Sequence, residues 1–225
     1  YRDFSFGLYE KALPAELSWQ ERLEQTRAAG YDFIEISIDE SDERLARLDW
    51  DIYEKRKLRE AVDETGVFIP TMCLSGHQRY PIGSAYPEIR KKGMEIMDKA
   101  IRFASETGIR IVELAGYDSW YDEPSTEETA ENFLRNLEIS IKWASRLGVH
   151  LAIENIGVEF MNSLEKVMRY VNHFKTPYLM AYADIGNIYA ANKDIHREFA
   201  SARGHIVALH IKDTLEGIIR RIPYG

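Results

Sequence analysis

Residues 104–115, ASETGIRIVELA, contain the pattern that decides the fold. The first four residues finish a stretch of helical period, Gly108 follows, and Ile109–Ala115 is an apolar run with the composition of a buried strand. Glycine suits the left-handed conformation that ends a helix, because it has no Cβ atom. The segment therefore predicts a helix that passes directly into a strand.

The same junction recurs along the chain, as Gly30-Tyr31, Gly66-Val67, Gly148-Val149 and Gly204-His205. Glu88–Thr107 and Thr126–Leu147 carry apolar residues on one stripe and are predicted to be amphipathic helices. The candidate strands begin about 27 to 42 residues apart, the size of successive βα units. They are Phe4–Tyr9, Phe33–Ile38, Val67–Leu74, Ile109–Ala115, His150–Glu154, Leu179–Asp184 and Ile206–Ile211.

Strands that alternate with helices predict an α/β fold with a parallel sheet. A closed (β/α)8 TIM barrel takes about 250 residues, whereas this chain has 225 residues. No glycine-rich dinucleotide fingerprint follows Phe4–Tyr9, which disfavours an open doubly wound sheet. We therefore expect residues 1–225 to form a single barrel domain that is incomplete at its C-terminus, with the eighth strand and final helix absent.

Composition and charge narrow the classes of function. The chain is 45% hydrophobic and 29% charged, so it can bury a core, and it has no apolar run of the roughly 20 residues that a membrane span needs. A net charge of −8 disfavours nucleic acid and anionic membranes as partners. The lone Cys73 fits a reducing compartment, so a cytoplasmic protein with a small-molecule substrate is expected.

Three successive candidate strands end in residues that bind hard cations: Glu154, Asp184 and His210. Two carboxylates and an imidazole suit a divalent metal ion such as Mn²⁺, Mg²⁺, Co²⁺ or Zn²⁺. Taken separately, each residue is better interpreted as a helix cap or a core histidine. Because the carboxyl ends of barrel strands meet at one face, the three together favour a metal site.

Other polar residues near strand ends are candidates for binding substrate. Ser75, His77 and Arg79 alternate after the third strand and would present a hydroxyl, an imidazole and a guanidinium to a phosphate, although a solvated loop explains them equally well. The charged run Asp39–Arg47 is interpreted as a solvated loop and helix entry. Candidates for binding polyol oxygens are Lys11, Asn187 and Lys212.

Six segments spread over the whole chain carry a resemblance to a known family: Gly7–Pro14, Ser37–Glu40, Met72–Ser75, Leu114–Asp118, Asp184–Asn187 and His210–Thr214. In these segments the chain resembles the xylose-isomerase-like barrel superfamily. Within that superfamily it is similar to the L-ribulose-5-phosphate 3-epimerases of L-ascorbate and pentose catabolism.

The resemblance implies a metal-dependent isomerase that converts L-ribulose 5-phosphate to L-xylulose 5-phosphate through an enediolate, by proton abstraction at C3. It implies that Glu154, Asp184 and His210 are three of four metal ligands and that Glu154 also transfers a proton. The fourth ligand in the family is a glutamate on the last strand, which this chain does not contain. Asn187 stands where the related free-sugar epimerases have a histidine, in agreement with the phosphate-using branch.

Two other interpretations stay open. An aldose–ketose isomerase of a hexulose or pentulose phosphate would use similar ligands, and a non-catalytic barrel would only bind sugar phosphate. The superfamily also contains a DNA-repair endonuclease, but Asn187 and the segment Leu114-Ala115-Gly116 lack the histidines that its three-zinc site requires. An unfinished barrel exposes apolar edges, so a homodimer is also predicted.

Overall fold

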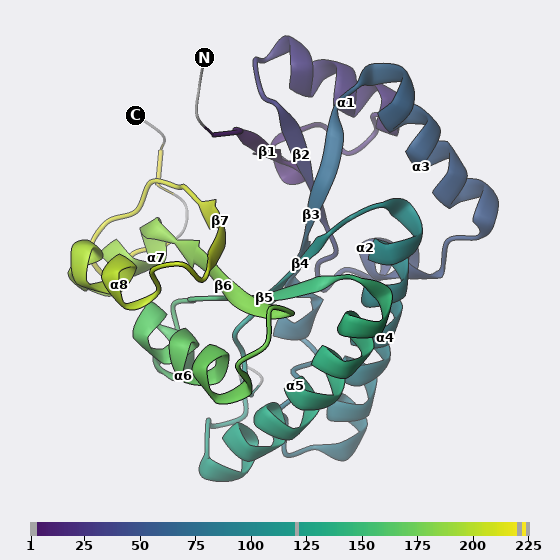
Figure 1. Cartoon of the computed structure of the whole chain (residues 1–225). Helices are drawn as coiled ribbons and strands as arrows, with labels where there is room; N and C mark the ends of the chain where they lie inside the picture. Colours follow the sequence, from purple (N-terminus) through teal and green to yellow (C-terminus); the bar gives the residue numbers. More distant parts are fainter. Residues whose placement is uncertain (1–3, 120–121, 220–221, 224–225) are drawn as a thin grey trace.

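The computed structural model of the chain describes residues 4–119, 122–219 and 222–223. Within those ranges seven strands form one parallel sheet, in the order in which they follow along the chain (Figure 1). The strands are β1 (Gly7–Tyr9), β2 (Phe33–Ser37), β3 (Phe68–Leu74), β4 (Ile111–Ala115), β5 (His150–Glu154), β6 (Leu179–Asp184) and β7 (Ile206–His210). The helices are α1 (Trp19–Ala28), α2 (Asp42–Ala46), α3 (Ile52–Thr65), α4 (Pro87–Thr107), α5 (Glu127–Leu147), α6 (Leu164–Phe174), α7 (Ile185–Ala190) and α8 (Ile195–Ser201).

The sheet curls as the strands of a TIM barrel do, with the long helices on its outer side (Figure 1). Neighbouring strands lie about 4.8 Å apart, so a flat sheet would separate β2 from β6 by about 19 Å. The Tyr182 hydroxyl of β6 nevertheless donates a hydrogen bond of 2.8 Å to Glu35 of β2. The concave face is therefore narrow enough for side chains of distant strands to meet.

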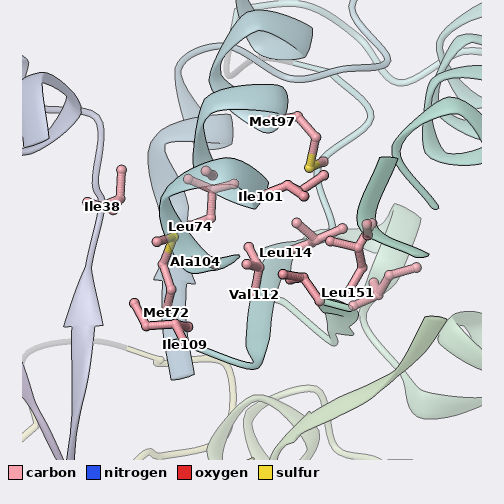
Figure 2. Packing of buried hydrophobic residues seen from close by; sticks show 14 of the residues in the cluster. Ile38, Met72, Leu74, Met97, Ile101, Ala104, Ile109, Val112, Leu114 and Leu151 are labelled. Atoms are coloured by element: carbon pink, nitrogen blue, oxygen red, sulfur yellow. The ribbon is translucent and has the colours of Figure 1, made fainter. Parts of the chain in front are cut away.

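Side chains along each strand alternate between the two faces of the sheet, so apolar side chains lie on one face and polar side chains on the other. In β2, Ile34 and Ile36 are fully buried in the hydrophobic core, whereas Glu35 between them contacts residues on the concave side. Figure 2 shows Leu114 of β4 near Met97 and Ile101 of α4, all members of the same buried core. Helices cover the convex face, so apolar residues lie there and polar residues gather inside the curl.

The predicted junctions are confirmed, because all five glycines lie in the left-handed region, at φ angles of 84° for Gly30, 70° for Gly66, 89° for Gly108, 67° for Gly148 and 79° for Gly204. Both predicted amphipathic helices are present as α4 and α5. The first strand is shorter than predicted. It begins at Gly7 because only Gly7–Tyr9 pairs with β2, and the Phe6 N–H donates instead to the Asp32 side chain.

The interpretation of Asp39–Arg47 as a solvated loop is wrong at its arginines. Arg47 is buried, and its guanidinium lies 2.8 Å from a carboxylate oxygen of Glu10, which is itself fully buried. Arg44 lies 2.9 Å from the same oxygen. No helix in the described ranges is long and apolar enough to cross a membrane.

Candidate metal centre

The last residues of three neighbouring strands come together at one edge of the sheet. Glu154 ends β5, Asp184 ends β6 and His210 ends β7, and the sheet register places Asp184 beside His210. One potential ligand atom from each residue lies within 4.8 Å of the others. The three residues that the sequence predicts as metal ligands thus form a compact group.

Backbone and side-chain contacts hold Asp184 in place. Its Oδ1 accepts a hydrogen bond of 2.8 Å from the Asn187 N–H and so caps α7, while its Oδ2 lies 2.8 Å from Lys212 Nζ. Lys212 also donates to Asn187 Oδ1 at 2.8 Å. The aspartate is 1% exposed, so its position is fixed by neighbours rather than by solvent. Asn187 and Lys212, both predicted to bind substrate, therefore adjoin a predicted metal ligand.

Charge inside the curl sets the protonation of the group. Burial raises the pKa of Glu154, but the charges of His210 and Lys212 outweigh it and hold the pKa below the ordinary value. Burial lowers the pKa of His210, but Glu35 and Glu154 outweigh it and raise the pKa well above the ordinary value. Glu154 is therefore ionised at neutral pH, as a residue that accepts a proton must be.

Two further glutamates face the interior of the curl, and the sequence analysis did not identify them. Glu35 accepts hydrogen bonds from Tyr182 and His210. Glu113 of β4 is fully buried, and neither of its carboxylate oxygens has a hydrogen-bond partner among the described residues. Burial raises the pKa of Glu113 well above its ordinary value, and the nearby charge of Glu154 adds to the effect. A charged residue between apolar neighbours in the middle of a strand was the available signal.

The residues present fit a divalent cation. Among the described residues, four acidic side chains face the interior and one lysine and one histidine oppose them: Glu35, Glu113, Glu154, Asp184, Lys212 and His210. The unpaired oxygens of Glu113 show that the interior contains oxygen acceptors that the hydrogen-bond donors of the described residues do not satisfy. Carboxylate oxygens together with an imidazole nitrogen are a donor set that Mn²⁺, Co²⁺ and Zn²⁺ accept.

The other predicted substrate-binding residues lie apart from this group. His77 is 2% exposed, and its Nε2 lies 3.1 Å from the Gly93 carbonyl oxygen in a hydrogen bond, so its imidazole is part of the interior and does not reach a ligand. Arg79 lies 3.3 Å from an Asp42 carboxylate oxygen. Lys11 pairs with Asp39, and Ser75 is half-buried at the start of the short turn that follows β3.

Comparisons with known proteins agree with this architecture. Residues 23–225 match the family described as Xylose isomerase-like TIM barrel. L-ribulose-5-phosphate 3-epimerase UlaE of Escherichia coli O1:K1 / APEC is 45% identical over 224 residues, which cover 100% of this chain and 78% of that protein.

Two solved structures share the fold at low sequence identity. D-psicose 3-epimerase in the presence of D-fructose superposes with a TM-score of 0.80 at 13% identity, over 93% of this chain and 73% of that one. L-ribulose 3-epimerase superposes with a TM-score of 0.72 at 19% identity, over 93% and 70%. These likenesses show that the curled sheet of this chain has the architecture of those barrels.

Proposed function

Because this chain belongs to the xylose isomerase-like TIM barrel family and, within it, to the L-ribulose-5-phosphate 3-epimerases, we propose that it interconverts L-ribulose 5-phosphate and L-xylulose 5-phosphate. The observation that carries the proposal is the group of Glu154, Asp184 and His210 at the strand ends of this fold. The proposal includes a role in L-ascorbate and pentose catabolism and a cytoplasmic location.

Glu154, Asp184 and His210 are the residues that would hold a divalent cation, Mn²⁺, Mg²⁺, Co²⁺ or Zn²⁺. When bound, such an ion supplies electrophilic stabilisation of the negative charge that develops on a ketose when the carbon beside its carbonyl loses a proton. The chain's own part is to orient the ligands. Asp184 is fixed by the α7 cap and by Lys212, and His210 by carboxylates on both ring nitrogens.

Glu154 is the group that accepts the C3 proton. Its carboxylate is ionised, and its Oε1 lies 2.7 Å from His210 Nδ1, which orients the carboxyl group. Inversion at C3 requires a second group that returns a proton from the opposite face of the substrate. In the family that this chain resembles, that group is a glutamate of the last strand.

Lys212 and Asn187 are placed to bind substrate oxygens, because they lie beside Asp184 and Lys212 brings a positive charge to the rim of the site. Lys11, Ser75 and Arg79 remain predicted contacts of the phosphorylated ketose. To bind a phosphate, Lys11 and Arg79 would exchange their present carboxylate partners for it. A homodimer also remains a prediction, which light scattering of the purified protein would check.

The substitution Glu154→Gln tests the reaction. Proton NMR of L-ribulose 5-phosphate in D₂O, with the protein as encoded and Mn²⁺, should show exchange at C3 and formation of L-xylulose 5-phosphate. Glu154→Gln should slow that exchange by about 10²- to 10⁴-fold, the usual contribution of a general base. Glu159→Gln changes an exposed glutamate that pairs with Lys166 and should leave the rate unchanged.

The same spectra separate the alternatives. Exchange at C1 instead of C3 would favour an aldose–ketose isomerase. Binding of the substrate without exchange at either carbon would favour a barrel that only binds sugar phosphate. A Glu154→Gln protein that turns over at the normal rate would remove Glu154 from the reaction.

A further inference from the structure

A chain of hydrogen bonds links three strands beneath the proposed metal ligands. The Tyr182 hydroxyl of β6 donates to Glu35 Oε1 of β2 at 2.8 Å, and Glu35 Oε2 lies 2.7 Å from His210 Nε2 of β7. We infer that Glu35 and Tyr182 are positioning residues that fix the His210 imidazole so that its Nδ1 faces the cation. The inference rests on the proposed function, since that function supplies the cation.

The partners of the imidazole assign different roles to its two nitrogens. Tyr182 donates to Glu35 Oε1, which leaves Glu35 Oε2 to accept the Nε2–H of His210. Nδ1 lies on the other side of the ring, 2.7 Å from Glu154 Oε1 and hence within the ligand group. Nδ1 is therefore the ligand atom and Nε2 the anchored atom. A histidine that binds a metal commonly donates its other N–H to a carboxylate in this way.

The burial and packing of the pair suit a positioning role. Glu35 is 4% exposed and Tyr182 is 2% exposed, so each polar group depends on its partner within the protein. The Tyr182 ring also lies against the imidazole, with centroids 4.6 Å apart at an angle of 45°. One tyrosine thus restrains both the ring of His210 and the carboxylate that holds it.

A second tyrosine nearby has a different arrangement and serves as a control. The Tyr9 ring centroid lies 6.4 Å from that of His210, but its hydroxyl is hydrogen-bonded to Ser37 Oγ at 3.0 Å and not to Glu35. Glu198 matches Glu35 in burial at 4% exposure, yet it accepts hydrogen bonds from the backbone at the start of α6. Neither residue contacts the ligand group in a hydrogen bond.

The test is Mn²⁺ binding to the protein as encoded, measured by isothermal titration calorimetry and Mn²⁺ electron paramagnetic resonance. Glu35→Gln leaves one acceptor oxygen where two donors point, so the Mn²⁺ dissociation constant should rise by about 10- to 100-fold. Tyr182→Phe should raise it by a smaller factor. Glu198→Gln and Tyr9→Phe, the same two substitutions at matched sites, should leave it unchanged.

Nitrogen-15 NMR of histidine in the Zn²⁺-loaded protein gives a readout that general destabilisation does not change. The unsubstituted protein should show His210 with a protonated Nε2 and a metal-bound Nδ1, and Glu35→Gln should shift or lose that pattern. Circular dichroism shows whether Glu35→Gln folds. If it does not fold, the Mn²⁺ dissociation constant of Tyr182→Phe tests the positioning role instead.

The outcomes separate the inference from the function on which it rests. If the unsubstituted protein binds no Mn²⁺, the metal-dependent function and the inference both fail. If the unsubstituted protein binds Mn²⁺ and Glu35→Gln and Tyr182→Phe bind it equally tightly, the positioning role alone is overturned.

Discussion

Two buried acidic regions lie near the strand ends, and they differ in how the chain balances their charge. The Glu10 cluster consists of Glu10, Arg22, Arg44 and Arg47, with all three guanidinium groups within 3.0 Å of Glu10 Oε1. In the metal centre four acidic side chains meet Lys212 and His210 as the cations among the described residues. The chain thus surrounds Glu10 with more cations than it needs, whereas acidic groups outnumber the cations in the metal centre, which indicates a place for a bound cation.

The partners of each region support that distinction. Glu10 also accepts a hydrogen bond of 2.8 Å from the Ser37 N–H, so it ties the end of β1 to the end of β2. Arg22 donates in addition to the carbonyl oxygens of Leu17 and Ala15 and fixes the loop before α1. In the Glu10 cluster the buried atom without a hydrogen-bond partner is a donor nitrogen, Arg44 Nη1, whereas in the metal centre both carboxylate oxygens of Glu113 lack a partner among the described residues.

The substitution Glu10→Gln should have the largest effect on stability. It leaves the buried guanidinium groups of Arg22 and Arg47 and the half-buried one of Arg44 facing a neutral amide, and removing one partner of a buried ion pair costs about 3–5 kcal/mol. Urea denaturation should show that loss in the free energy of unfolding. Glu16→Gln, at an exposed position in the same loop, should change it by less than about 0.5 kcal/mol. A decrease of less than about 1 kcal/mol in the free energy of unfolding of Glu10→Gln would show that the cluster contributes little to stability.

A substitution at His77 tests how a buried titratable side chain outside both regions affects the pH dependence of stability. Burial lowers its pKa from 6.5 to about 4, so the folded protein keeps the ring neutral while the unfolded chain protonates it. The unfolded state thus binds more protons between these values, and stability should fall by about 3 kcal/mol as the pH drops from 6.5 to 4. Urea titrations across that range should show a flatter dependence for His77→Gln, and identical slopes would contradict the assignment.

The fold was predictable because its signals are local. A glycine at φ > 0 stands at five helix-to-strand junctions, although Lys175 takes that conformation between α6 and β6. The amphipathic stripes of α4 and α5 show where helices cover the sheet. The residues Glu154, Asp184 and His210 were predictable because each one ends a strand, and the ends of parallel strands meet at one face.

The rest of the site depends on contacts between distant strands. Glu35 contacts Tyr182 and His210, which are 147 and 175 residues away along the chain, so only the curl of the sheet brings them together. Arg44 and Arg47 were interpreted as solvated because their partner, Glu10, is a single glutamate more than 30 residues earlier in the chain. The hydrophobic periodicity of a strand predicts the face of the sheet on which a side chain lies. It does not predict which side chain of a distant strand that residue contacts.

Added Mn²⁺ should stabilise the folded protein through the metal centre and not through the Glu10 cluster. A cation that binds only the folded state adds about 2.7 kcal/mol when its concentration is 100 times its dissociation constant. Thermal denaturation with Mn²⁺ should show this gain, and a chelator should reverse it. Asp184→Asn keeps an α7 cap, since asparagine also caps helices, but should abolish the gain. Asp194→Asn, the matched cap of α8, should retain the gain, and its loss there would point to unspecific binding.

Glu113→Met should give the smallest effect, and its sign distinguishes the two regions. A buried carboxyl group without hydrogen bonds destabilises the fold, so an apolar side chain of similar length should raise the free energy of unfolding by about 1 kcal/mol at neutral pH. The folded protein retains the Glu113 proton above pH 4.5, where the unfolded chain loses it. The contribution of Glu113 to stability therefore falls with rising pH, and the gain from Glu113→Met should grow with pH in urea titrations. Substituting Glu10 removes a charge that its surroundings require, whereas substituting Glu113 removes a buried carboxyl group that is protonated at neutral pH. A loss of stability at both sites would therefore show that the two regions do not differ in this way.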